Sequence, residues 1–138
     1  MFGRSCACVG LAALLLVSSA SGQDKEDPII ATVKKALKDK SKPFTMLVLI
    51  KVKEGEAAKF EEAFVAAIKA TRKEKGNLVY NLNRSLDNPN EFVVFERWKD
   101  FAALESHINS KHIQMLLKTV IPLLDAPPEI DVLVPAGE

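Results

Sequence analysis

Two segments that are apolar on both faces constrain the fold of this chain most. Residues 44–52 (FTMLVLIKV) and 91–98 (EFVVFERW) have the length and the β-branched and aromatic content of strands. Each carries apolar side chains at odd and at even positions: Leu47 and Leu49 oppose Met46 and Val48, and Val93 and Phe95 oppose Phe92 and Val94. An antiparallel sheet with one face open to water would alternate apolar and polar residues. The pattern therefore predicts a sheet that is buried on both faces.

The order of the remaining elements indicates how this sheet is connected. A helix is predicted over residues 56–75 and ends at Gly76, and a strand over 78–86 leads into the turn Asp87-Asn88-Pro89-Asn90. After the strand 91–98, two helices are predicted over 100–109 and 110–124, followed by a last strand over 130–134. The order β-α-β-β-α-β predicts an α+β, ferredoxin-like fold with an antiparallel sheet.

The helices of such a unit cover only one face of the sheet, so something else has to bury the other. A second copy of the chain could do so, and we expect a homodimer with the two sheets packed face to face. The alternative is a helix that precedes the domain. Within the segment 23–43, Asp27-Pro28 reads as a helix start, and an apolar stripe follows from Ile29 to Leu37. The main domain is expected to cover residues 44–138.

The first 22 residues are typical of a secretory signal peptide. A basic start ends at Arg4, an apolar block spans residues 9–17, and small residues suited to cleavage occupy 18–22. The apolar block is too short to span a bilayer comfortably, which disfavours a membrane anchor. We therefore expect an exported protein, periplasmic or secreted, with no membrane attachment after cleavage.

Cleavage would also change what chemistry is available. Cys6 and Cys8 are the only cysteines, so the mature domain would have no thiol nucleophile, thiolate ligand or disulfide. Removing Arg4 from the 19 basic and 18 acidic side chains leaves 18 of each. This balance gives no reason to expect nucleic acid as a partner.

Strand alternation groups several candidate site residues on one face of residues 91–98. Phe92, Glu96 and Trp98 share that face. If the face lines an enclosed cavity, Glu96 would be desolvated and its pKa raised, as a general acid or base requires. Trp98 could form a flat wall for an aromatic ligand. The alternatives are an ion pair between Glu96 and a lysine or arginine, and a core or interface position for Trp98.

Three further side chains could bind or catalyse. Tyr80 could donate a hydrogen bond to a ligand oxygen, and His107 could act as a general acid or base near neutral pH. Core packing for Tyr80 and local capping for His107 are the alternatives, and His112 would ordinarily be a surface or interface residue. On one continuous helix His107 and His112 would lie about 140° apart. A helix break at Asn109-Ser110 would remove this restriction on how the two imidazoles are arranged. With no third ligand nearby, we still expect no metal site.

These features together resemble the antibiotic biosynthesis monooxygenase family of dimeric α/β barrels. The resemblance covers about residues 44–134 and rests on these motifs in this order: Lys53-Glu54-Gly55, Gly76 before Tyr80, the turn 87–90, Glu96-x-Trp98, and Leu104-x-x-His107 followed by His112. It implies a homodimer of ferredoxin-like units, each with a cavity between sheet and helices. Its members include cofactor-free oxygenases of quinols and anthrones, haem-degrading enzymes and an isomerase.

Positions that define two subfamilies depart from their patterns here. Haem-degrading members have asparagine, tryptophan and histidine where this chain has Val48, His107 and Leu117, and anthrone oxygenases have asparagine where it has Val94. With these two subfamilies set aside, the chain is similar to the quinol monooxygenases. The resemblance then implies a cofactor-independent oxidation of a quinol or phenol by dioxygen, with Tyr80 and His107 as catalytic residues. Phe92, Glu96, Trp98 and His112 would bind the substrate. The alternative is a protein that binds or isomerises a small ligand without oxygen.

Overall fold

A computed structural model describes residues 26–136 of the chain; the expected signal peptide at 1–22 lies outside the described residues. The elements, in order, are α1 (Pro28–Ala36), β1 (Phe44–Lys51), α2 (Ala57–Thr71), β2 (Asn77–Arg84), β3 (Glu91–Trp98), α3 (Phe101–Ile108), α4 (Lys111–Val120), the 3-10 turn η1 (Ile121–Leu123) and β4 (Glu129–Leu133). Among these described helices, none combines the length and the apolar character needed to cross a membrane.

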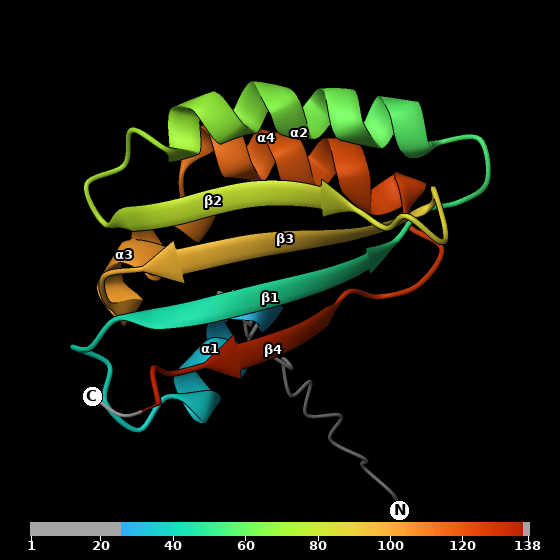
Figure 1. Cartoon of the computed structure of the whole chain (residues 1–138). Coiled ribbons are helices and arrows are strands. Elements are labelled where there is room, and N and C mark those ends of the chain that lie inside the picture. The colour runs from blue at the N-terminus through green and yellow to red at the C-terminus, as the bar shows by residue number, and fades with distance from the viewer. Residues whose placement is uncertain (1–25, 137–138) are drawn as a thin grey trace, which may run out of the picture.

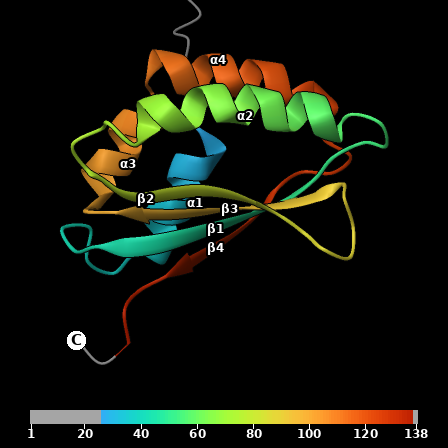
Figure 2. The same ribbon diagram turned by 45° about the horizontal axis from the view of Figure 1, so that its top comes forward.

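The four strands form one antiparallel sheet in the order β2-β3-β1-β4, which confirms the ferredoxin-like fold. Helices α2 and α4 pack side by side across one face of this sheet (Figures 1 and 2). The strand residues that point toward the helices are the buried ones, including Phe44, Met46, Phe92 and Trp98. In the antiparallel register Tyr80 lies opposite Glu96, which places both side chains on the helix-covered face.

One predicted helix end needs correction, and a predicted break between helices is confirmed. Helix α2 ends at Thr71, and residues 72–76 form turns, so Gly76 does not cap the helix as expected. The predicted break at Asn109-Ser110 is present: α3 ends at Ile108, and the Ser110 side chain caps α4 by accepting a hydrogen bond from the Ile113 amide. The two histidines therefore lie on different helices, and the angle expected for one helix does not apply.

The other face of the sheet carries the second set of apolar side chains. Leu49, Phe95 and Leu133 are each more than a third exposed there. Helices α2 and α4 lie on the opposite side of the sheet (Figure 2). The alternative that the N-terminal helix covers this face is wrong. Helix α1 packs against α3 and β4, and its Ile30 and Val33 are buried in the core on the helix side.

Gly76 has a different role from the expected cap, because it lets the chain after α2 approach α3 closely. A Cβ atom at Gly76 would overlap the Cβ of Ala103 and lie 3.3 Å from its Cα. We expect Gly76→Ala to destabilise the protein by about 1–3 kcal/mol through this overlap. Chemical denaturation measures the loss.

A double-mutant cycle with Ala103→Gly separates the overlap from other effects of the substitution. Ala103→Gly alone should cost about 1 kcal/mol because glycine weakens a helix. In that background Gly76→Ala should cost much less than in the parent protein. Equal costs in both backgrounds would contradict a steric origin.

Candidate active site

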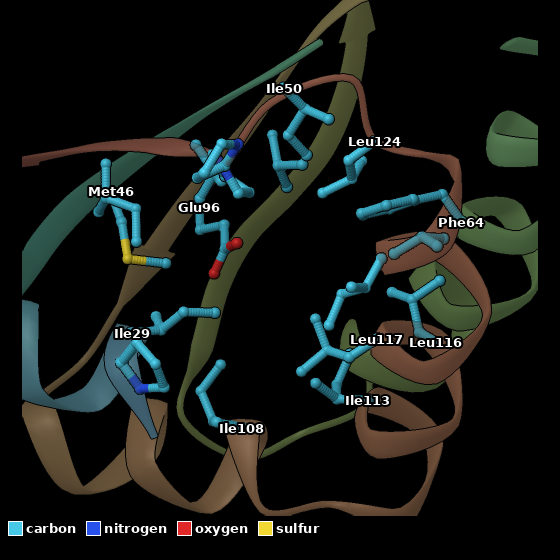
Figure 3. Close-up of a pocket in the computed structure, with 18 of the residues that line it drawn as sticks. Ile29, Met46, Ile50, Phe64, Glu96, Ile108, Ile113, Leu116, Leu117 and Leu124 are labelled. Atoms are coloured by element: carbon cyan, nitrogen blue, oxygen red, sulfur yellow. The ribbon is translucent and has the colours of Figure 1, made fainter. Parts of the chain in front are cut away.

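A cavity of about 650 Å³ lies between the covered face of the sheet and the helices. Its walls are mostly apolar, with Met46 and Ile50 from β1, Phe64 from α2 and Ile113 from α4 (Figure 3). Helix α1 and the segment after η1 complete it, through Pro28, Ile29 and Thr32 on one side and residues 124–128 on the other. Such a space suits an apolar small molecule, and the few polar groups in its wall would set how that molecule is oriented.

Glu96 is one of three buried polar residues in these walls. The residue is 5 % exposed, and its carboxyl group projects into the cavity (Figure 3). The Trp98 indole Nε1 donates a hydrogen bond of 2.9 Å to Glu96 Oε2. Burial raises the pKa of Glu96 from 4.5 to about 8; the hydrogen bond from Trp98 opposes this, and the charge of Glu74 adds to it. Glu96 is therefore protonated at neutral pH and can donate a proton.

Tyr80 and His107 line the same cavity and lie next to each other, with ring centroids 5.4 Å apart. Burial raises the pKa of Tyr80 well above 10, and the nearby carboxyl groups of Glu96 and Glu74 add to the shift. The Tyr80 hydroxyl thus stays protonated and can donate a hydrogen bond to a ligand. Burial, with a smaller contribution from His112, lowers the pKa of His107 to about 3. The imidazole is therefore neutral and has one nitrogen able to accept a proton.

Glu74, which no pattern in the sequence singled out, lies between the two histidines. Its carboxylate is 2.9 Å from His107 Nδ1 and 2.8 Å from His112 Nε2. The expectation that the histidines have no third potential ligand nearby is therefore corrected, since one ligand atom from each of the three residues lies within 4.8 Å of the others. Glu74 follows α2 and is 33 positions from His107, so no local spacing pattern connects them.

Three of the six residues predicted for the site do not line the cavity. Trp98 is fully buried behind two residues of the cavity wall. Its ring centroid lies 4.5 Å from that of His107, and its indole donates a hydrogen bond to Glu96. Phe92 packs behind the wall against Phe60, with ring centroids 4.8 Å apart. His112 lies outside, bonded to Glu74. Alternation along a strand places a side chain on a face, but it does not say whether the side chain fills the core or borders empty space.

The cavity also contains the positions that distinguish the subfamilies. Val48, Val94, His107 and Leu117 all line it. Three of these four side chains are aliphatic, so this chain has apolar surface where the related haem and anthrone enzymes were expected to have polar groups. The polar groups that remain in the inner wall are Tyr80, Glu96 and His107.

A ferredoxin-like sheet that encloses an apolar cavity with a few convergent polar groups defines a class of small ligand-binding α+β proteins. Comparison with known families gives a more specific assignment: the model of the antibiotic biosynthesis monooxygenase family matches residues 43–118. The chain belongs to this family.

Individual relatives agree with that assignment. YcnE of Bacillus subtilis, whose name is that of a monooxygenase, is 34 % identical over 88 residues, which are 62 % of this chain and 93 % of YcnE. The structures of Rv0793 from Mycobacterium tuberculosis and PA3566 from Pseudomonas aeruginosa are each 30 % identical, with TM-scores of 0.65 and 0.66. The similarity covers 70 % and 72 % of this chain and 97 % and 99 % of those chains. Helix α1 precedes the residues that the family model matches, yet it forms part of the cavity wall.

Proposed function

We propose that the protein is a cofactor-independent monooxygenase that oxidises a quinol or related phenol with dioxygen. One observation supports this most: the carboxyl group of Glu96, the phenol of Tyr80 and the imidazole of His107 converge in a mostly apolar cavity. The apolar walls suit a hydrophobic ring, and the three polar groups suit its hydroxyl oxygen.

In the proposed reaction His107, Tyr80 and Glu96 each have one role. His107 accepts the proton of the substrate hydroxyl, and the Tyr80 hydroxyl donates a hydrogen bond to the resulting oxyanion. The electron-rich anion reduces dioxygen, and a carbon–oxygen bond forms at the ring. Glu96 then supplies a proton as the oxygen–oxygen bond breaks. One oxygen atom stays on the ring and the other leaves as water, so quinol and dioxygen give hydroxyquinone and water.

The proposal includes where and in what form the protein acts. We propose a homodimer joined through the open sheet face, whose exposed Leu49 and Phe95 are otherwise unexplained. We also retain the proposal that the protein is exported, which rests on the pattern of residues 1–22 alone.

The direct test is oxygen uptake with a reduced naphthoquinol under conditions of slow autoxidation. The enzyme should consume one dioxygen per quinol and form a hydroxyquinone, and label from ¹⁸O₂ should enter the product once. No enzyme-dependent uptake above autoxidation would contradict the proposal. Tight binding of the quinol with no oxygen consumed would instead favour the non-oxidative alternative.

Two variants on α1 show whether activity depends on the cavity. Thr32 is exposed at the cavity wall, and Lys35 is exposed on the same helix but is not part of that wall. Thr32→Trp should raise KM by obstructing entry, whereas Lys35→Trp should leave KM unchanged. Equal effects of the two substitutions would argue against this cavity as the substrate site.

A further inference from the structure

The cluster of Glu74, His107 and His112 connects the cavity to the protein surface. Glu74 Oε2 faces His107 Nδ1 at 2.9 Å and Glu74 Oε1 faces His112 Nε2 at 2.8 Å. The side chains of His107, Glu74 and His112 are 2 %, 21 % and 29 % exposed. The exposed fraction thus increases along the cluster, from the cavity wall to solvent. The break between α3 and α4 allows both imidazoles to reach one carboxylate.

The hydrogen bond to Glu74 determines which tautomer His107 adopts. A carboxylate can only accept a hydrogen bond, so a neutral His107 carries its proton on Nδ1. The other ring nitrogen, Nε2, is then unprotonated. No hydrogen bond joins Nε2 to another described residue, and residues 26–136 contain no fully buried side-chain nitrogen or oxygen without a partner. Nε2 is therefore accessible, and the space that His107 borders is the cavity.

The surroundings of His112 suit proton exchange with water. His112 is partly exposed, and its Nε2 lies 3.3 Å from Thr71 Oγ1 and 3.5 Å from Ser110 Oγ. The titratable groups around His107 are Tyr80 on β2, Glu96 on β3, Glu74 after α2 and His112 on α4. Among these only Glu74 makes a hydrogen bond to the ring of His107.

We infer that Glu74 and His112 are positioning and proton-transfer residues for His107. Glu74 holds His107 with Nε2 unprotonated toward the cavity, and His112 with Glu74 forms the route by which a proton taken from the substrate leaves to solvent. The substrate proton binds at His107 Nε2 as the N–H bond on Nδ1 breaks and Glu74 is protonated. His112, in the tautomer that is protonated on Nδ1, then accepts the proton from Glu74 at Nε2 and releases its Nδ1 proton to water. No electrons are exchanged in these steps. The assignment of His107 as the base rests on the proposed function. The tautomer of His107 rests only on its hydrogen bond to Glu74.

Nitrogen-15 NMR of the imidazoles tests the tautomer without any substrate. The chain has two histidines, so His112→Gln assigns the spectrum. We expect His107 to show a protonated Nδ1 and an unprotonated Nε2 in the parent protein, and Glu74→Ala to shift the population toward protonated Nε2. Protonation at Nε2 in the parent protein, or no change in Glu74→Ala, would overturn the inference. A failure of oxygen uptake alone would remove the proposed function and leave the tautomer result intact.

Kinetics test the proton route. Glutamine at position 112 can still donate a hydrogen bond to Glu74 but cannot relay a proton. His112→Gln should therefore keep the tautomer and KM and lower kcat, and Glu74→Ala should lower kcat about 10²-fold because the base is no longer oriented. Glu105→Gln, an exposed substitution on α3, is the matched control and should change neither. An unchanged kcat in His112→Gln would overturn the route.

A divalent cation bound by the same three side chains would be the competing explanation. In that case exhaustive chelation would abolish activity, and Zn²⁺ or Mn²⁺ would restore it and perturb both histidine spectra. We expect activity and spectra that are unchanged by chelation. Loss and metal-specific recovery would overturn the inference.

Discussion

Replacement of Glu96 by glutamine should make the protein more stable at neutral pH. The pKa of Glu96 is raised from 4.5 to about 8, so between these values the unfolded chain releases the proton while the folded chain keeps it. The contribution of a protonated Glu96 to the free energy of unfolding is complete below pH 4.5 and is lost as the pH rises toward 8. At pH 7 this loss amounts to about 3 kcal/mol, and above pH 8 to about 5 kcal/mol. Glutamine has no charge to desolvate and can still accept the hydrogen bond from Trp98.

Urea unfolding at a series of pH values measures this difference. The curves for the parent protein and Glu96→Gln should coincide near pH 4 and diverge steadily up to about pH 8. His107 contributes the opposite slope at lower pH, because its pKa is lowered from 6.5 to about 3 and the unfolded chain binds the proton first. This rise of stability with pH, which comes from His107, should be the same in both proteins. Parallel curves across the whole range would show that Glu96 is not held protonated.

The same substitution should nearly abolish activity while it stabilises the fold. Loss of a positioned proton donor is expected to lower kcat about 10²- to 10⁴-fold. In the parent enzyme kcat should fall as the pH rises through about 8, because Glu96 loses its proton there. Increased stability together with lost activity would distinguish a functional carboxyl group from one retained for structure. A Glu96→Gln enzyme with normal kcat would exclude Glu96 from the reaction.

A charged residue in the middle of the open sheet face should convert the proposed dimer into a monomer. Phe95 and Leu49 are 36 % and 38 % exposed on this face, with Leu47 and Val93 partly buried beside them. Sheet packing would bury this patch in a dimer, so Phe95→Arg would leave an unpaired charge between apolar surfaces. We expect the sedimenting mass to halve at micromolar concentration.

Val65→Arg on α2 provides the matched control. Val65 is a comparably apolar, 61 % exposed side chain on the helix side of the molecule. Its replacement should leave the mass unchanged. A parent protein that sediments as a monomer at micromolar concentration would contradict the dimer directly, and dissociation by both variants would show that the sheet face is not the specific interface.

Much of the fold follows from local pattern, and the residues show why. The alternation in residues 44–52 and 91–98 depends on the geometry of a single strand, so the side chains that share a face of β1 or of β3 could be grouped before any contact was known, but the alternation did not show which face lines the cavity. The end of α2 was misplaced by four residues. Gly76 resembles a helix cap in sequence, but its lack of a side chain is needed for the close contact with Ala103.

The site was predictable only in part, because a cavity depends on distances between elements. Alternation grouped Glu96 with Phe92 and Trp98 on one face, and only the helices packed over that face make it the inner one and bury Glu96. Phe92 and Trp98 share that face but fill the core, a difference set by the neighbouring Phe60 and His107. Glu74 was missed because a turn after α2 brings it to His107, and nothing in its local sequence marks that contact.

The protonation of Glu96 is the central claim, and infrared spectroscopy measures it most directly. Difference spectra between the parent protein and Glu96→Gln should contain the carbonyl stretch of a protonated carboxylic acid at pH 7, and this band should disappear as the pH passes about 8. A carboxylate spectrum for Glu96 at pH 7, with no protonated band above pH 5, would contradict the account.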